Sequence, residues 1–319
     1  MVRSLTLQAE LAEEFGTCVF DVTLDCEDGA PVGGEKDHAL MVVALLRNEH
    51  CAIKNVAKST SSRVAVRVHP VDHPAFEQDI DIILGGAGAS VCHLMLPKVE
   101  SVADIDHAVR LVDSALRGSE RSDPIPIHAL IESPMAVQHA AAIAAHPRVQ
   151  SLSFGLMDFV SSHGGAIPSS AMGLDLRSPG EGLDQFSHPL VVRAKLEIAS
   201  ACHAHGKVPS HCVVTEFKNP SIVQAAARRA ANAMGFTRMW SIHPDQIRPI
   251  LAAFAPAEHE VVQASHIICE AQAAGWAPIS VEGRLHDRAS YRYYWQVLEK
   301  AHQTARLHRD DPVQKFFLS

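Results

Sequence analysis

The sequence predicts an α/β protein, a (β/α)8 TIM barrel with a C-terminal helical extension. Short runs rich in β-branched residues alternate with longer helical stretches, and clusters of acids follow several of these runs. Such alternation is typical of parallel βαβ units. A doubly wound sheet would usually carry a Gly-rich turn after its first strand, and none is seen there. A closed barrel, which brings the ends of all its strands to one face, is therefore favoured.

The predicted strands are near-continuously hydrophobic, as strands covered on both faces should be. Seven are clear: Cys18–Leu24, Arg63–Val68, Val91–Leu96, Ile127–Ile131, Gln150–Phe154, Lys207–Val214 and Thr237–Ile242. The eighth, first in the chain, has only Val2–Leu7 available before a helix over Ala9–Phe15. The sequence thus predicts a short first strand at Val2–Leu7.

The segments between these strands read as helices, several of which open with Ser, Asp or Pro. Examples are Lys36–Arg47, Ser101–Arg117, Met135–Ala145, Pro189–His205 and Pro220–Met234. The longest interruption, Phe159–His188, is rich in Gly and Pro and is predicted to be an active-site loop.

Two further helical stretches, Ala257–Ala274 and Ser290–Arg309, follow the last strand. We therefore assign residues 1–250 to a catalytic barrel and residues 251–319 to a C-terminal helical extension of the same domain that also forms an oligomer interface. Aromatic residues crowd the extension at Tyr291, Tyr293, Tyr294 and Trp295. Aromatics this dense favour docking, either on the chain's own barrel or against another subunit.

Composition excludes several classes of protein. The 319 residues are 47% hydrophobic, enough for a sizeable core, and the net charge is −8. An acidic chain has no global attraction for nucleic acid or an anionic membrane, so neither is expected as a partner. No run is apolar enough to span a bilayer, which predicts a cytoplasmic protein. The seven cysteines are odd in number and include no Cys-x-x-Cys, so they are predicted to be reduced packing residues.

Acids stand where three predicted strands end. Glu27 and Asp28 follow one strand, Glu132 follows a second and Asp158 a third. Acids that converge are costly without a cation, and oxygen ligands suit Mg2+ first and Mn2+ second. Each acid taken alone could instead cap a helix. Arg67 ends a further strand, where its guanidinium suits a substrate carboxylate or, in a structural role, Glu27.

Six motifs in order resemble the family of the HpcH/HpaI aldolases, the citrate lyase β subunit and the malyl-CoA lyases. They are Leu24-Asp-x-Glu-Asp28, Val66-Arg-Val68, Leu96-Pro-Lys-Val-Glu-Ser101, Ala129-Leu-Ile-Glu-Ser-Pro134, Phe154-Gly-x-x-Asp158 and Ile242-His-Pro-x-Gln246. The resemblance implies that Glu132 and Asp158 ligate Mg2+, and that Arg67 and Glu132 contact the substrate. It also implies a homotrimer or homohexamer, with the active site completed by a neighbour's C-terminal segment.

The resemblance also bears on the substrate. Pyruvate aldolases of this group have a sequence similar to Asp-x-Glu-His at the first motif and use its His as a base. The acyl-CoA lyase branch has Glu-Asp in place of Glu-His, and this chain resembles that branch with Glu27-Asp28. This implies cleavage of a 3-hydroxyacyl-CoA, such as malyl-, citramalyl- or citryl-CoA, or of a related hydroxy-oxo acid, with coenzyme A as part of the substrate. An α-oxo acid and an enolate-derived product would result. The residues leave Asp28, Glu27 and a metal-bound water open as the base.

Three alternatives are weaker. An HpcH-type pyruvate aldolase acting on a free acid and a non-catalytic barrel subunit are both compatible with the same residues. A zinc site at His203, His205 and His211 is disfavoured, because a His-x-His pair on a helix points its rings about 200° apart. His243 is expected to be a structural histidine or to touch the phosphate end of a ligand.

Overall fold

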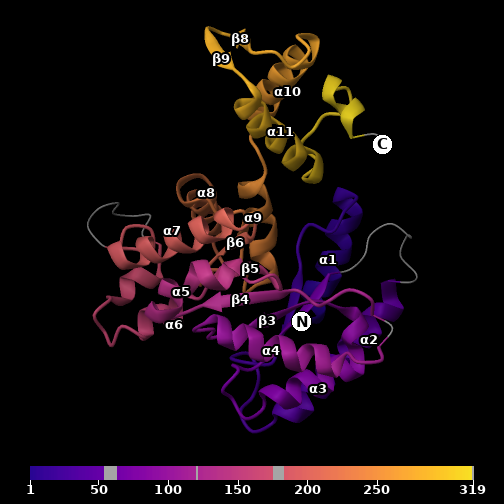
Figure 1. The fold of residues 1–319 in the computed structure, drawn as a ribbon, viewed down its shortest axis with the longest axis vertical. Coiled ribbons are helices and arrows are strands. Elements are labelled where there is room, and N and C mark those ends of the chain that lie inside the picture. The colour runs from indigo at the N-terminus through magenta and orange to yellow at the C-terminus, as the bar shows by residue number, and fades with distance from the viewer. Residues whose placement is uncertain (54–62, 120, 175–182, 318–319) are drawn as a thin grey trace.

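The structure, a computed structural model, describes residues 1–53, 63–119, 121–174 and 183–317. Its centre is a parallel sheet in which seven strands pair in chain order, β1 to β7. They are β1 (Val22–Asp25), β2 (Val64–Arg67), β3 (Val91–Leu96), β4 (Ile127–Ile131), β5 (Val149–Phe154), β6 (Val208–His211) and β7 (Arg238–Met239). The alternation of strand and helix is confirmed and each of the seven clear strands is present, although β1, β6 and β7 are clearly shorter than predicted (Figure 1).

The sheet curls into a half-barrel. Side chains of its first and last strands meet near the amino ends of the strands, where Arg238 of β7 donates to Asp21, just before β1, at 2.8 Å. Near the carboxyl ends, the guanidinium of Arg67 in β2 lies 5.2 Å from the centre of the ring of Trp240, which follows β7. No backbone ladder joins β7 to β1 among the described residues, so the complete eight-stranded barrel is not observed.

The predicted first strand at Val2–Leu7 is wrong, because these residues form helix α1 (Val2–Phe15). Leu5, Leu11 and Ala12 recur at helical spacing and are buried, and a left-handed Gly16 ends the helix at φ 70°. The Gln8 amide donates to the carbonyls of Phe20 and Arg63 at 2.8 and 2.9 Å. The helix therefore caps the amino ends of β1 and β2 instead of adding a strand.

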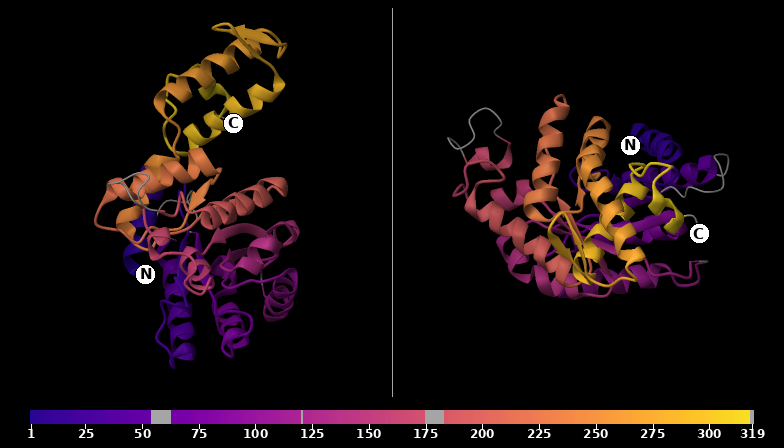
Figure 2. Two further views of the ribbon diagram at one scale, coloured as in Figure 1. Left: turned by 90° about the vertical axis from the view of Figure 1, so that its left-hand side faces the viewer. Right: turned by 90° about the horizontal axis from the view of Figure 1, so that it is seen from above.

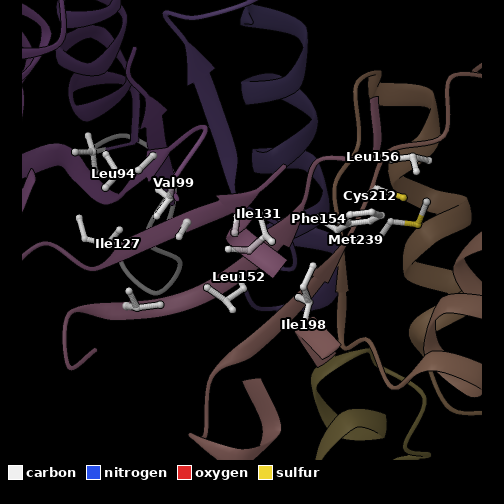
Figure 3. Packing of buried hydrophobic residues seen from close by; sticks show 14 of the residues in the cluster. Leu94, Val99, Ile127, Ile131, Leu152, Phe154, Leu156, Ile198, Cys212 and Met239 are labelled. Carbon is white, nitrogen blue, oxygen red and sulfur yellow. The ribbon is translucent and has the colours of Figure 1, made fainter. Parts of the chain in front are cut away.

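Helices cover the sheet (Figures 1 and 2). The five predicted between the strands are confirmed as α2 (Glu35–Ile53), which runs six residues past its predicted end, α4 (Val102–Ala115), α5 (Pro134–Ala145), α7 (Pro189–Ala204) and α8 (Pro220–Met234). Two helices that were not predicted, α3 (Phe76–Ala87) and α9 (Ile247–Phe254), complete the layer. Every residue of β2 and β4 is buried, as strands with two covered faces require. Figure 3 shows Leu152 and Phe154 of β5 packed with Ile198 of α7 in this core.

The segment predicted as an active-site loop, Phe159–His188, begins inside the short helix α6 (Leu156–Ser161) and contains a 3-10 turn at Ser169–Met172. Its end is anchored by the buried Lys195, which donates to the Gln185 carbonyl and side-chain oxygen at 2.9 Å each. Pro179, Gly180 and Gly182, part of the Gly- and Pro-rich pattern, lie outside the described residues.

The C-terminal extension has its own hydrophobic cluster. It contains α10 (Glu258–Ala273), the hairpin of β8 (Ile279–Val281) and β9 (Arg284–His286), α11 (Arg288–Gln303) and a 3-10 turn at Pro312–Phe316. Ile267, Ile268 and Leu298 lie in this cluster, whereas Ile250 of α9 belongs to the core around the sheet. Figures 1 and 2 show the extension standing away from the sheet.

The crowded aromatics pack mainly within that extension. Tyr291 is buried and its hydroxyl donates to the Ala277 carbonyl at 2.7 Å, while Trp295 stacks on Phe317 at 5.2 Å. Tyr294 is half-buried, and Tyr293 is 57% exposed. Docking of all four on the barrel is therefore wrong, because α10 and α11 bury each other. Their place in an oligomer interface stays a prediction.

None of the described helices is long and apolar enough to cross a membrane. The side chains of six of the cysteines are described, and all six are free thiols, as predicted.

Candidate active site

The residues singled out in the sequence gather at the carboxyl edge of the sheet. Arg67 is the last residue of β2, Lys98 and Glu132 follow β3 and β4, and Asp158 lies in the first turn of α6, after β5. Glu27 and Asp28 follow β1. Parallel strands end at one edge, so their C-terminal side chains share one region.

Arg67 is held by two acids. Its Nε and Nη2 donate to the two oxygens of Asp25 at 2.7 and 2.6 Å, and its Nη1 lies 2.6 Å from Glu27 Oε2. Burial opposes the charge, but the hydrogen bonds to Asp25 and the nearby acids outweigh it and raise the pKa of Arg67. The Arg67 side chain is only 8% exposed. The pairing with Glu27, the structural role considered for Arg67, is thus present.

Asp25 was missed as a site residue. In the ladder it lies opposite Arg67, which explains the two-pronged contact. Its position two residues before Glu27 was a usable signal, because alternate strand residues share a face. The Asp25 oxygens also accept from the backbone N–H groups of Glu27 and Gly29, at 3.1 and 2.9 Å. Asp25 therefore organises both the guanidinium and the turn after β1.

The turn separates the environments of Glu27 and Asp28. Glu27 is buried, and its Oε1 lies 2.8 Å from Lys98 Nζ, so cations contact both of its oxygens. The Asp28 side chain is 63% exposed, and its Oδ2 lies 3.7 Å from Arg67 Nη1. Of the two acids, Asp28 has the carboxylate more open to a ligand or a proton.

Glu132 and Asp158 form an acid pair near Lys98. Glu132 is buried and accepts a hydrogen bond from the Lys98 backbone N–H at 2.7 Å. Burial raises its pKa to about 7; the Lys98 N–H opposes the rise, and repulsion from Asp158 and Glu27 adds to it. Asp158 is half-buried. A pair of acids of this kind, one of them buried with a raised pKa, is a suitable donor set for a hard divalent cation.

Space around Glu132 is shaped by a glycine. A Cβ atom on Gly155 would lie 2.7 Å from Glu132 Cδ, closer than real contacts allow. The Glu132 side chain therefore lies against the Gly155 backbone, which limits its carboxylate on one side. The residues present therefore fit a Mg2+ site, and the roles of Glu132 and Asp158 as its ligands stay a prediction.

A different group with metal-ligand chemistry lies at the opposite end of the sheet. Among the described residues, Asp21, Cys92 and His93 bring one ligand atom each within 4.8 Å of the others. Arg63 and Arg238, however, occupy the two oxygens of Asp21 at 2.6 and 2.8 Å. Two guanidiniums repel a cation, so this group is a buried polar network that links the strand starts.

The histidines considered as zinc ligands have other partners. His203 Nε2 lies 2.7 Å from the Gly235 carbonyl, and His211 is buried in ring contact with Phe186 and Phe236. In the part of the chain that is described, His203, His205 and His211 do not belong to any group of three possible metal ligands.

His243 has a structural role. Its Nδ1 accepts the Asp245 backbone N–H at 3.2 Å at the start of a 3-10 turn, and its ring stacks on Phe217. The satisfied structural histidine predicted as one of its two roles is therefore observed.

Known proteins are similar to this chain in sequence and fold. Residues 4–244 match the family described as HpcH/HpaI aldolase/citrate lyase. The chain is 28% identical over 287 residues to the L-malyl-CoA/beta-methylmalyl-CoA lyase of Cereibacter sphaeroides, covering 88% of this chain and 86% of that protein. A crystal structure of a citrate lyase from Burkholderia xenovorans matches with a TM-score of 0.80 and 46% identity, over 97% of this chain and 90% of that one.

A more distant structure has a similar fold. It is CitE from Mycobacterium tuberculosis in complex with magnesium, acetoacetate and coenzyme A. The match has a TM-score of 0.63 and 22% identity, and it covers 93% of this chain and 95% of that one.

Proposed function

Since this chain belongs to the HpcH/HpaI aldolase/citrate lyase family, we propose that it is a Mg2+-dependent carbon–carbon lyase acting on a 3-hydroxyacyl-CoA. Malyl-, citramalyl- and citryl-CoA are the candidate substrates, and the products are an α-oxo acid and a second acyl-CoA formed from an enolate. The single observation that carries the proposal is the acid pair Glu132 and Asp158 beside the cations Lys98 and Arg67. At this carboxyl edge of the sheet, the cations suit an anionic substrate and the acids suit a metal ion.

Glu132 and Asp158 would hold Mg2+, with Mn2+ as the second choice. When bound, the cation supplies Lewis-acid stabilisation of charge that develops on oxygen. The buried Glu132 needs such compensation, because its carboxylate is otherwise costly to ionise. Arg67 and Glu132 contact the substrate in this proposal, and Asp25 fixes the plane of the Arg67 guanidinium.

Asp28 is the favoured base among the groups left open by the sequence, because its side chain is exposed while Glu27 lies between two cations. The Asp28 carboxylate takes the proton from the substrate hydroxyl. The electron pair of that O–H bond forms the new carbonyl of the α-oxo acid, and the pair of the broken C–C bond forms the thioester enolate. Protonation of the enolate carbon yields the second acyl-CoA. Arg67 would stabilise the negative charge that develops on oxygen.

We further propose that residues 1–250 form the catalytic half-barrel and residues 251–319 an extension that contacts neighbouring subunits in a homotrimer or homohexamer. Support comes from large apolar side chains exposed on the extension, where Val262 is 60%, Leu285 75% and Tyr293 57% exposed. Exposed apolar groups of this size are more typical of an interface than of a monomer surface.

The test is a substrate screen. Malyl-, citramalyl- and citryl-CoA are incubated with the metal-free protein and with Mg2+ or Mn2+, and release of α-oxo acid is measured. We expect metal-dependent cleavage of at least one thioester. Cleavage of free hydroxy-oxo acids alone would identify an HpcH-type pyruvate aldolase instead. Failure to cleave any of them would leave a non-catalytic barrel.

A further inference from the structure

Lys98 contacts two carboxylates that come from different strands. Its backbone N–H donates to Glu132 Oε2 at 2.7 Å, and its Nζ lies 2.8 Å from Glu27 Oε1. Glu132 follows β4, whereas Glu27 follows β1. One residue after β3 therefore joins the proposed metal ligand to the acid that pairs with Arg67.

The Lys98 backbone is in the left-handed region, with φ 51°. Residues with a Cβ adopt this region rarely, and such strain is retained where surrounding contacts over-determine it. A glycine there would present the same N–H to Glu132 without strain. The contact with Glu132 alone therefore does not require lysine, and the ammonium is what the lysine side chain adds.

The ammonium acts on Glu27, which has only one other cation partner among the described residues. Glu27 Oε2 lies 2.6 Å from Arg67 Nη1, while Nε and Nη2 of Arg67 are used by Asp25. A guanidinium has five N–H donors, and in Arg67 two of them are used by Asp25 and one, on Nη1, by Glu27. The second N–H groups of Nη1 and Nη2 are thus left for a substrate. Without the Lys98 ammonium, Glu27 would rely on Nη1 alone and compete with the substrate for its second N–H.

We propose that Lys98 is a positioning residue that acts through Glu27: its ammonium shares the Glu27 carboxylate, so that Glu27 takes only one N–H of Arg67 Nη1 and the second N–H stays available to an anionic substrate oxygen. The backbone N–H of Lys98 separately aims Glu132. The inference rests on the proposed function, because it assumes that this edge of the sheet binds substrate.

The test compares Lys98→Met with Lys98→Arg. Lys98→Met keeps the N–H and much of the aliphatic side chain but removes the charge, so we expect KM for the cleaved thioester to rise about tenfold or more. The Mg2+ dissociation constant, measured by calorimetry, should stay within about threefold, because the N–H on Glu132 is retained. Lys98→Arg should restore most of the lost affinity.

The control is Lys218→Met. Lys218 follows β6 in the chain and its Nζ lies 5.9 Å from the centre of the Phe217 ring, and no ion pair joins it to the carboxylates discussed above among the described residues. Its loss should leave KM unchanged, which separates the effect of Lys98 from a general loss of positive charge.

A double-mutant cycle with Glu27→Gln distinguishes positioning from direct substrate contact. If Lys98 acts through Glu27, adding Lys98→Met to Glu27→Gln should cost little more than Glu27→Gln alone. Additive losses, or an unchanged KM in Lys98→Met, would overturn the inference.

The cycle remains informative if the proposed reaction fails. When the wild-type protein cleaves none of the thioesters, the same variants are titrated with glyoxylate or pyruvate in the presence of Mg2+. Weaker oxo-acid binding in Lys98→Met, with the same non-additivity, supports the inference independently. Unchanged binding contradicts it.

Discussion

Gly155 lies directly against the side chain of Glu132, so that a Cβ on residue 155 would come within 2.7 Å of Glu132 Cδ. The Gly155 backbone itself, at φ −94° and ψ 86°, does not require glycine. The glycine is therefore needed for space and not for its conformational freedom, which makes its replacement a specific probe of Glu132.

Gly155→Ala should weaken Mg2+ binding by about tenfold or more, because the added methyl group displaces the Glu132 carboxylate from its place beside Asp158. Calorimetric titration with Mg2+ measures the effect. Gly85→Ala is the matched control, since a Cβ at Gly85 meets nothing within 4 Å. An alanine at 155 that leaves Mg2+ affinity unchanged would show that Glu132 is not a ligand.

Glu132→Gln and Asp158→Asn should each abolish measurable Mg2+ binding and leave the far-UV circular dichroism unchanged. Each substitution keeps the side-chain shape but removes one anionic ligand. Mg2+ binds oxygen ligands at about 2.1 Å, and its affinity for this site depends on both carboxylate charges. Asp72→Asn, at an exposed acid after β2, is the control. Normal Mg2+ affinity in either variant would remove that residue from the proposed site.

The stability of the metal-free protein should fall as pH rises from about 4.5 to about 7. Burial raises the pKa of Glu132 from 4.5 to about 7, so the folded state binds its proton more tightly than the unfolded state does. The stability that comes from this tighter proton binding is fully present below pH 4.5 and is lost as pH rises from 4.5 through about 7. The loss in the free energy of unfolding is on the order of 3 kcal/mol.

Urea unfolding at pH 5 and pH 8 measures this loss. Glu132→Gln, which does not titrate, should lose less stability between these pH values than the wild-type protein. Saturating Mg2+ at pH 8 should stabilise the wild-type protein more than it stabilises Glu132→Gln. Equal pH dependence in the two metal-free proteins would contradict the assignment to Glu132.

Arg67→Lys should lower kcat/KM by about a hundredfold, because an ammonium cannot form the two-pronged contact with Asp25 while presenting a further edge to the substrate. Arg248→Lys is a matched control. Arg248 makes a similar two-pronged pair with Glu14, at 3.0 and 2.7 Å, but on an exposed surface where such pairs contribute little. Unchanged kinetics in Arg67→Lys would make Arg67 purely structural.

Much of the fold was predictable because buried parallel strands have a strong signature. β3 and β4 match the predicted bounds, since apolar runs with covered faces end sharply at polar residues. Val2–Leu7 was mistaken for a strand because six residues are too short to separate the two periodicities. Only the full run to Phe15, with Leu5, Leu11 and Ala12 on one face, reveals the helix.

The site was partly predictable for a similar reason. Strand ends are visible in a sequence, so Glu132, Asp158 and Arg67 could be placed at one edge of the sheet from the residue pattern alone. Which acid pairs with which cation depends on register and on turn geometry. Two such features are the pairing of Asp25 with Arg67 across β1 and β2 and the left-handed backbone conformation of Lys98. No single stretch of sequence encodes either of them.

The extension gives the last prediction, which compares two truncations. Ending the chain after Ala255 removes every part of the extension that follows α9 and leaves the core around the sheet intact, with Ile250 and Ala253 still packed in it. Ending it after Ser280 instead removes α11 while keeping α10, which exposes buried residues such as Ile267 and Ile268. We expect the first protein to be soluble and the second to aggregate.

Light scattering on the intact and shorter proteins tests the assembly at the same time. If the extension joins subunits, the intact chain should be a trimer or hexamer and the protein ending at Ala255 a smaller species. A double variant, Leu285→Ser with Tyr293→Ser, supplies the control, because both side chains are exposed in the single chain and their loss should leave its fold unchanged. Dissociation of that full-length variant would locate the interface on the β8–β9 hairpin and α11. An intact protein that scatters as a monomer would refute the oligomer, and an oligomer that survives removal of residues 256–319 would move the interface to the half-barrel.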